Sequence, residues 1–314
     1  MNIIVQKFGG TSVSTEDRRK QVAIKVKEAI ENGFTPIVVV SAMGRKGQPY
    51  ATDTLLTLID DKFKETNRNS KDLLMCCGEI ISSVVVANAL YNEGIEAVPL
   101  TGGQAGIITD DNFCEAEYIS IDIDRLLSVV REGKVPVVTG FQGITKDGYF
   151  TTLGRGGSDT TACILGNAVK AKEIEIYTDV DGIMTADPRI VEDASLIDEI
   201  TYNEVFQLAD QGAKVIHPKA VDLAKKGNIP LFIKNTLSES KGTLISNDIM
   251  CNERRYITGI TYLNNRIQVR IRLSENSNIK AYQSLLSILA KNHISLDLIN
   301  IFPAHQFFTV DKSE

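Results

Sequence analysis

The sequence predicts an α/β protein with a mostly parallel sheet between helices, followed by a partial α+β domain. Two patterns predict this fold. Short, continuous apolar runs, typical of parallel strands covered on both faces, alternate with helix-length segments as far as about residue 235. The order then changes to β-β-α-β-β, and the chain stops before the helix and strand that would complete a small two-layer domain. We therefore expect a main domain over residues 1–236, a polar linker over 237–257 and a truncated small domain over 258–314.

The first stretch, residues 3–12, combines a buried-strand pattern with groups that bind phosphate. Its apolar run ends at Lys7, the pair Gly9-Gly10 and two hydroxyl residues, just before a helix begins. Glycines let backbone N–H groups approach an anion, and a lysine adds a compact positive charge. An ordinary strand-to-helix turn with a solvated lysine is the alternative, and this stretch alone leaves both interpretations open.

The next elements continue in a β-α-β order. Thr15-Glu16-Asp17 predicts a capped helix start, and Gly33 ends that helix. Residues 36–41 predict a second buried strand, because their apolar run is continuous. After a loop over 42–51, Thr52-Asp53 predicts the cap of a further helix. Loops at the ends of parallel strands are where such folds place their chemistry.

A long apolar helix is expected over residues 72–91, ending before Gly94. It contains one anomaly, the pair Gly78-Glu79. A carboxylate within an apolar helix is either exposed at the helix edge or directed into a cleft. The pattern leaves these two interpretations equal.

Residues 151–161, after a buried strand over 135–140, form the stretch richest in polar groups that suggest a function. Three glycines surround Arg155, and Ser158-Asp159 predicts the cap of a helix over 162–170. A helix start fronted by glycines and one arginine suits a planar anion, because arginine binds a carboxylate with two parallel hydrogen bonds. The alternative is a hairpin-to-helix turn that needs flexible residues.

The last strands of the main domain lie at 174–177 and 230–233. The first of them leads into three aspartates, Asp179, Asp181 and Asp187, which either bind magnesium or a nucleotide or serve as ordinary turn formers. A helix over 202–215 would carry Lys214, a second candidate phosphate-binding lysine. We interpret His217, which precedes a proline, as structural.

Composition excludes several classes. The chain has 314 residues, a net charge of −6 and 43% hydrophobic residues, which fits a globular protein and argues against a nucleic-acid partner. Its five cysteines include no C-x-x-C pair, so we expect reduced thiols. The N-terminus lacks a signal pattern, and no run approaches 18 apolar residues. We therefore expect a cytoplasmic protein that does not enter a membrane.

Five motifs together resemble one family. KFGGTS, the helix-borne GE, GRGGSDTT, TDVDGI with ADPR, and GAKVIHPK occur in the order seen in aspartate kinases of the amino-acid kinase superfamily, over nearly all of residues 1–235. The resemblance implies the amino-acid kinase fold followed by an ACT-type regulatory domain. It implies transfer of the γ-phosphoryl group of ATP, with Mg²⁺ carried on the ATP phosphates, to the side-chain carboxylate of L-aspartate. This reaction leads to lysine, threonine and methionine. An end-product amino acid as effector and a homodimer or higher homo-oligomer are further expectations.

The resemblance also implies roles for individual residues. Those matching the family's catalytic positions are Lys7, Arg155, Asp159 and Lys214. Those expected to bind the aspartate are Thr52, Glu79, Arg155, Gly156, Gly157 and Ser158, with Glu79 on the ammonium group and Arg155 on the α-carboxylate. Those expected to bind the nucleotide are Lys7, Phe8, Gly9, Gly10, Ser41, Thr178, Asp179, Asp181, Arg189 and Lys214, with Thr11, Ser12 and Asp187 beside them. No protein metal site is expected.

The sequence departs from the family at three points. Met184 replaces a common tyrosine beside the adenine, and Cys76-Cys77 replaces smaller residues. The tail has Asn276-Ser277-Asn278 where a proline-glycine turn is usual. The alternatives are a kinase for glutamate or N-acetylglutamate, and a non-catalytic amino-acid sensor. Neither G-x-G-x-x-G after the first strand nor G-x-x-x-x-G-K-[ST] occurs, which excludes a nicotinamide dehydrogenase and a P-loop kinase.

Overall fold

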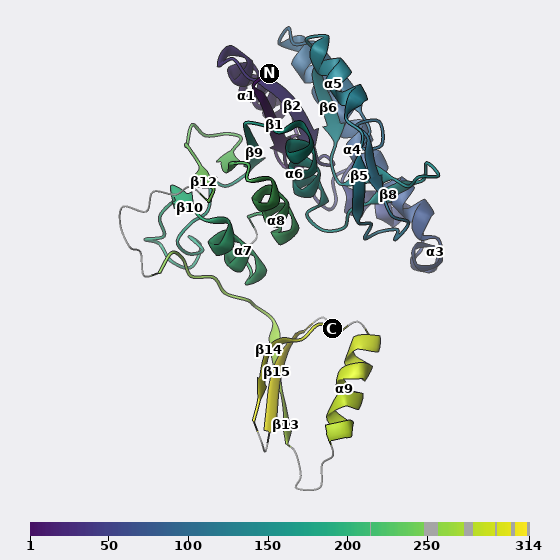
Figure 1. Cartoon of the computed structure of the whole chain (residues 1–314), viewed down its shortest axis with the longest axis vertical. Coiled ribbons are helices and arrows are strands. Elements are labelled where there is room, and N and C mark those ends of the chain that lie inside the picture. The colour runs from purple at the N-terminus through teal and green to yellow at the C-terminus, as the bar shows by residue number, and fades with distance from the viewer. Residues whose placement is uncertain (214, 248–256, 273–278, 293, 303–304, 313–314) are drawn as a thin grey trace. The chain divides into compact units, whose positions relative to one another are not determined.

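The computed structural model describes residues 1–213, 215–247, 257–272, 279–292, 294–302 and 305–312. The chain divides into two compact units, Met1–Thr261 and Tyr262–Glu314, and each unit contains its own sheet (Figure 1).

Among the described residues, the main sheet of the first unit has eight strands in the order β10-β12-β11-β9-β1-β2-β6-β3. In chain order these are β1 (Ile3–Phe8), β2 (Thr35–Val40), β3 (Ala97–Leu100), β6 (Val135–Thr139), β9 (Glu173–Thr178), β10 (Glu199–Ile200), β11 (Leu231–Asn235) and β12 (Thr243–Ile245). Every neighbouring pair is parallel except β11 with β12. Phe8 lies opposite Val40 on one side and Tyr177 on the other, so β1, β2 and β9 end at the same edge of the sheet. The prediction of a mostly parallel sheet is confirmed.

Helices cover both faces of this sheet. They are α1 (Glu16–Glu31), α4 (Arg68–Asn92), α5 (Asp124–Arg131), α6 (Gly157–Val169), α7 (Tyr202–Asp210) and α8 (Pro218–Gly227). α1 and α4 pack on the face that carries Phe8, Val38 and Val40. α5, α6 and α8 pack on the face that carries Val5 and Val39, and Figure 1 shows α6 beside α8. The alternation of side chains along each buried strand thus supplies two separate apolar cores.

A second, smaller sheet, with the order β5-β4-β7-β8, lies within the first unit. Its strands are β4 (Ile107–Thr109), β5 (Tyr118–Ile121), β7 (Gln142–Ile144) and β8 (Phe150–Thr152). Strands of three or four residues are too short to show a hydrophobic period, so these strands leave no clear signal in the sequence. β8 packs against α4 and leads into the glycine segment at 154–157.

Of two predicted helix caps, the structure has one and lacks the other. Thr15 caps α1 as predicted, since its side chain accepts a hydrogen bond from Arg18 N. The cap predicted at Thr52-Asp53 is wrong: Ala51 precedes α2 (Thr52–Leu55), so Thr52 is the first helical residue. α2 continues into a 3₁₀ turn, η1 (Leu56–Leu58), and then α3 (Asp61–Thr66).

The helix predicted over residues 202–215 ends earlier in the structure, and a separate helix follows beyond the predicted range. α7 ends at Asp210, and Gly212 follows with φ +107°, a conformation that glycine adopts readily. α8 then begins at Pro218, where the fixed φ of proline favours a first helical position. His217 is the cap of α8, because its Nδ1 accepts a hydrogen bond from Lys219 N at 3.3 Å.

The predicted linker over 237–257 contains a strand of the main sheet. β12 pairs with β11, Leu231 lying opposite Ile245, so the chain up to Ile245 belongs to the first unit. Residues 248–256 lie outside the described part of the chain. The strand was missed because Thr243–Ile245 is short and follows the turn residues 238–242.

Within the described residues, α4 is the one helix that is long and apolar enough to cross a membrane. Nearly half of its apolar window is buried inside the protein, and it contacts α1, β3, β6 and β8. α4 also carries two buried carboxylates, Asp72 and Glu79. These features are those of a core helix of an α/β domain.

The second unit contains β13 (Arg266–Arg272), α9 (Ile279–Lys291), β14 (Asp297–Ile301) and β15 (His305–Asp311), with the sheet order β13-β15-β14. The first strand of the predicted β-β-α-β-β order is absent, because residues 258–262 form no strand. That segment instead bonds to the first unit: Ile260 N donates to Thr185 O at 2.8 Å, and Thr258 Oγ1 donates to Glu204 Oε1. The turn at Asn276-Ser277-Asn278 lies outside the described residues.

Candidate active site

Lys7 stands near the carboxyl end of β1, in the middle of the sheet. Its Nζ lies 2.6 Å from Asp159 Oδ1, and the two side chains are only 11% and 13% exposed. Asp159 belongs to the first turn of α6. This ion pair therefore joins the end of β1 to the start of α6, and it holds a cation at the carboxyl edge of the sheet.

The turn after β1 requires glycine. A Cβ on Gly10 would stand 2.5 Å from Ala42 O, so the turn runs directly against the loop that follows β2. Gly9 N donates to Tyr177 O at 3.1 Å and thereby connects the turn to β9. The backbone is in this way held close to three strand ends.

α6 begins earlier than its sequence suggests. We predicted a helix over 162–170 capped by Ser158-Asp159, but α6 starts at Gly157, and Ser158 and Asp159 lie inside its first turn. Gly156 occupies the cap position in the left-handed conformation, φ +68°, and it has no side chain that could cap the helix. In the first turn Gly157 N already donates to Gly154 O at 3.1 Å, which leaves the N–H groups of Ser158 and Asp159 for an anion, and the helix dipole also favours an anion there.

Gly156 is additionally fixed by His217. A Cβ at Gly156 would stand 2.2 Å from His217 Cβ, so the cap of α8 packs directly against the glycine segment. Burial lowers the pKa of His217, although the charge of Asp159 opposes that effect. These contacts are consistent with the structural role predicted for His217.

Glu79 is directed into the protein rather than outward. It is 3% exposed, and its Oε1 accepts a hydrogen bond from Ala42 N at 3.0 Å. Its Oε2 is buried and has no hydrogen-bond partner among the described residues. Burial raises the pKa of Glu79 to about 8, with the Ala42 hydrogen bond opposing the shift. An unpaired buried carboxylate oxygen is costly, and a cationic group would relieve that cost.

These groups line one open cavity of about 310 Å³. The predicted residues that it brings together are Lys7, Ser41, Thr52, Glu79, Arg155, Gly156, Gly157, Ser158 and Asp159. Phe141 and Gly154 also line it and were not predicted as site residues. Phe141 has φ +70°, unusual for a bulky residue, and it comes two residues after the last residue of the buried strand β6. Its place at a strand end was the available signal.

Lys7 and Ser41 line this cavity, and the other predicted nucleotide residues that the structure describes do not. Phe8 is fully buried and stacks on Tyr177 with 4.8 Å between ring centroids. Thr178 ends β9, next to the turn after β1. Lys214 lies outside the described residues.

The aspartates of the nucleotide segment all have partners. Arg45, which sequence reasoning missed, lies 2.6 Å from Asp179 Oδ2. Asp181 accepts hydrogen bonds from Asn235 Nδ2 at 2.7 Å and Ser238 Oγ at 2.8 Å. Asp187 forms an ion pair with Arg189, with 2.6 Å between Asp187 Oδ2 and Arg189 Nη2. Among the described residues, no group of three or more His, Cys, Asp or Glu could hold a metal ion.

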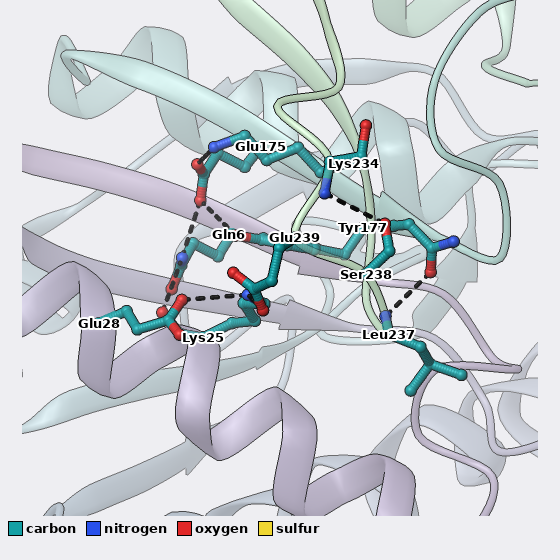
Figure 2. Close-up of polar contacts among 11 residues, drawn as sticks. Gln6, Lys25, Glu28, Glu175, Tyr177, Lys234, Leu237, Ser238 and Glu239 are labelled. Carbon is teal, nitrogen blue, oxygen red and sulfur yellow. Dashed lines mark hydrogen bonds and ion pairs between the residues drawn. The ribbon is translucent and has the colours of Figure 1, made fainter.

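A largely buried polar cluster lies on the face of the sheet that α1 covers (Figure 2). Glu175, on β9, accepts hydrogen bonds from Gln6 Nε2 at 2.8 Å and from Tyr177 OH at 3.1 Å, and its other oxygen pairs with Lys234 of β11. Lys25 of α1 pairs with Glu239 at 3.0 Å (Figure 2). The cluster connects three neighbouring strands on the face opposite α6.

Comparison with known proteins agrees with this geometry. Residues 2–235 match the amino acid kinase family. Aspartokinase 1 of Bacillus subtilis (strain 168) is 44% identical over 318 residues, which cover 99% of this chain and 78% of the relative. The chain belongs to the amino acid kinase family and, within it, to the aspartokinases.

Solved aspartokinases have the same fold. Aspartokinase III of E. coli in complex with lysine and aspartate, in the T-state, superposes with a TM-score of 0.81 at 28% identity, covering 99% of this chain and 79% of that one. The same E. coli enzyme in complex with aspartate and ADP, in the R-state, gives a TM-score of 0.72 at 27% identity, covering 98% and 78%. The predicted amino-acid kinase fold is confirmed.

Proposed function

We propose that this aspartokinase transfers the γ-phosphoryl group of ATP to the side-chain carboxylate of L-aspartate, giving 4-phospho-L-aspartate. One observation carries the proposal. A single cavity is lined by the Lys7–Asp159 pair, by Arg155 and by Glu79, whose buried Oε2 has no partner among the described residues. Such a cavity offers cationic groups for phosphate and carboxylate and an anionic group for an ammonium.

The amino-acid half of the site comprises Glu79, Arg155 and Thr52. Arg155 binds the α-carboxylate, for which its planar guanidinium is suited. Glu79 Oε2 accepts from the substrate ammonium, which gives this buried oxygen the partner that it lacks. The nearby cation also stabilises the carboxylate form of Glu79 against the effect of burial. Gly156, Gly157 and Ser158 shape the wall against which the substrate lies.

The phosphoryl half of the site comprises Lys7, the N–H groups of Gly9 and Gly10, and the start of α6. Lys7 neutralises charge on the transferring group, and Asp159 holds Nζ in place. Phosphoryl transfer requires positioning and charge neutralisation more than covalent chemistry, so no nucleophilic side chain is needed. Lys214 is proposed as a second phosphate-binding lysine.

The nucleotide lies along the ends of β1 and β9. Ser41 contacts its phosphates, and the segment bearing Thr178, Asp179, Asp181 and Arg189 contacts the remainder. Support comes from the E. coli relative solved with aspartate and ADP, and from the parallel pairing that sets Thr178 beside the glycine turn. Mg²⁺ enters bound to the ATP phosphates and neutralises part of their charge.

The second unit is proposed to be an ACT-type regulatory domain that binds an end-product amino acid. Its support is the E. coli relative solved with lysine and the β13-α9-β14-β15 order. A cytoplasmic homo-oligomer is part of this proposal.

One coupled assay tests the function. The chain is given MgATP with L-aspartate, L-glutamate or N-acetyl-L-glutamate, and hydroxylamine traps any acyl phosphate as a hydroxamate. We expect hydroxamate with aspartate and little with the other two acids. Preferential turnover of glutamate would instead establish the alternative substrate class, and absence of turnover with all three would refute the proposal.

A further inference from the structure

Asp72 is a fully buried carboxylate in the first turns of α4, and it does not line the cavity. Its Oδ1 accepts a hydrogen bond from Thr152 Oγ1 at 2.8 Å. Its Oδ2 accepts from Thr152 N and from Cys114 N, both at 2.9 Å. One side chain therefore binds two other segments, β8 and the loop after β4, through three hydrogen bonds.

The segments that Asp72 joins both lead to the amino-acid half of the site. On α4, Glu79 follows Asp72 by seven residues, which is about 10 Å along the same face of a helix. On the other side, Thr152 precedes Arg155 by three residues, an extended reach of roughly 10 Å at most. The position of Glu79 relative to Arg155 thus depends on how α4 is held against β8.

The neighbouring contacts reinforce the same attachment. Cys76 Sγ donates to Thr151 O at 3.9 Å, and Gln142 Nε2 donates to Cys76 O at 3.2 Å. Cys114 has φ +75°, and a residue other than glycine keeps such a conformation when its surroundings fix it. The bond from Cys114 N to Asp72 contributes to that restraint.

We propose that Asp72 is a positioning residue of the aspartate-binding half-site, which it sets by fixing α4, and so Glu79, relative to the Arg155 segment. The inference rests on the proposed function. The nucleotide half-site is built on β1 and β9, whereas the hydrogen bonds described for Asp72 go to Thr152 and Cys114. Loss of Asp72 therefore affects the two substrates unequally, whereas a purely structural role would affect both.

The test is Asp72→Ala in the full chain, by initial rates with hydroxylamine trapping and by equilibrium binding of L-aspartate and of MgADP. We expect KM and Kd for aspartate to rise about tenfold or more, the size of change that loss of about 1.4 kcal/mol produces. KM for ATP and Kd for MgADP should stay within about twofold. Equal weakening of both substrates, or an unchanged aspartate affinity, overturns the inference.

Two variants serve as controls. In Asp72→Asn the amide oxygen can accept both backbone N–H bonds while its NH₂ donates to Thr152 Oγ1, so aspartate affinity should recover to within about threefold of the wild type. Ser83→Ala removes another buried hydroxyl of α4, one that bonds only within the helix, to Ile80 O. Ser83→Ala should change neither the affinity for L-aspartate nor that for MgADP. A rise in the aspartate Kd like that of Asp72→Ala would show that the loss of any buried polar group of α4 has this effect.

Thr152→Val keeps the test decisive if Asp72→Ala does not fold. It removes one hydroxyl donor and preserves the shape and the backbone bond. A selective rise of about threefold in the aspartate KM is expected, and an unselective effect overturns the inference. If the wild type fails to phosphorylate aspartate, the proposed function fails; if it succeeds while these variants keep normal aspartate affinity, only the present inference fails.

Discussion

At the scale of single residues, the candidate site depends on two oppositely charged side chains, Lys7 and Glu79, which differ in the partners that they have within the protein. Lys7 has a partner within the protein, Asp159, whereas Glu79 has one oxygen without a partner among the described residues. The first arrangement holds a cation in place, and the second leaves an anion ready for an incoming charge. Both groups are therefore open to direct test.

Replacing Lys7 by alanine should lower kcat by at least ~10²-fold, because it removes the charge directed at the transferring phosphoryl group. The measurement is the rate of hydroxamate formation at saturating ATP and aspartate. Circular dichroism should show an unchanged fold. Near-normal turnover would contradict the role of Lys7.

Replacing Glu79 by glutamine should weaken aspartate binding while KM for ATP stays near its wild-type value, because only the ammonium loses a charged partner. Initial rates at varied concentrations of each substrate measure this. A raised KM for ATP with an unchanged KM for aspartate would assign the two half-sites the other way round.

Glu79 should also make stability depend on pH. Its pKa of about 8 in the folded protein lies above the ordinary value near 4.5. The folded state therefore holds this proton more tightly, and the Glu79 contribution to the free energy of unfolding is full below pH 4.5 and falls progressively up to about pH 8. We expect the Tm of Glu79→Gln, measured relative to the wild-type Tm at the same pH, to be higher at pH 8 than at pH 5. An equal difference in Tm at both pH values would show that Glu79 does not titrate in this range.

At the scale of elements, the start of α6 and the cap of α8 form one rigid contact through Gly156. Gly156→Ala should raise KM for aspartate about tenfold, because a Cβ would meet His217 and displace the Arg155 segment. Gly148→Ala is the matched control, since Gly148 also has a positive φ, +84°, but has nothing within 4 Å of a Cβ. Both variants lose stability because alanine disfavours a positive φ, Gly156→Ala loses more because of the contact with His217, and only Gly156→Ala should lose affinity.

The sequence predicted the elements whose signals are local. Thr15, the continuous apolar runs of β1 and β2, and the long apolar pattern of α4 are each sufficient where they stand. The early start of α6 was missed because glycines normally disfavour a helix, and tertiary contacts with Phe141 and His217 outweigh that preference here. β12 was missed because its pairing with β11 is a contact that no local pattern records.

For the candidate site, too, local sequence signals could be read, whereas contacts between distant segments could not. The resemblance carried by five ordered motifs grouped Lys7, Glu79 and Arg155, which the structure places around one cavity, whereas residue types alone left Lys7 and Glu79 open. Contacts between distant segments, such as Arg45 with Asp179, leave no trace in local sequence. The direction of Glu79 also needed coordinates, since an amphipathic pattern cannot say what faces a helix.

At the scale of the whole molecule, the cavity lies entirely within the first unit. A chain ending after Thr261 should therefore retain kcat within a few-fold and lose any response to an effector amino acid. Steady-state rates with and without L-lysine, L-threonine or L-methionine measure this. Loss of activity in a chain that remains folded would show that the second unit contributes to the site.

The end point of that chain matters. Thr258 and Ile260 bond to the first unit, so a chain ending at Ser246 should be less stable than one ending at Thr261. Thermal unfolding of the two shortened chains measures the difference, and equal Tm values would show that the segment contributes nothing.

The polar cluster around Glu175 has a consequence for how the sheet assembles. Gln6 lies directly opposite Glu175 where β1 pairs with β9. A one-residue slip of β1 along β9 would turn the Gln6 side chain into the apolar core on the α6 face of the sheet. The same slip would bury the ammonium of Lys7 under α1 on the other face. Glu175 would then keep Lys234 but lose its amide donor. A misaligned β1 would therefore lose the Gln6–Glu175 hydrogen bond and would also bury the Lys7 ammonium. The alignment that places Lys7 at the cavity is thus favoured by Gln6, the residue immediately before it.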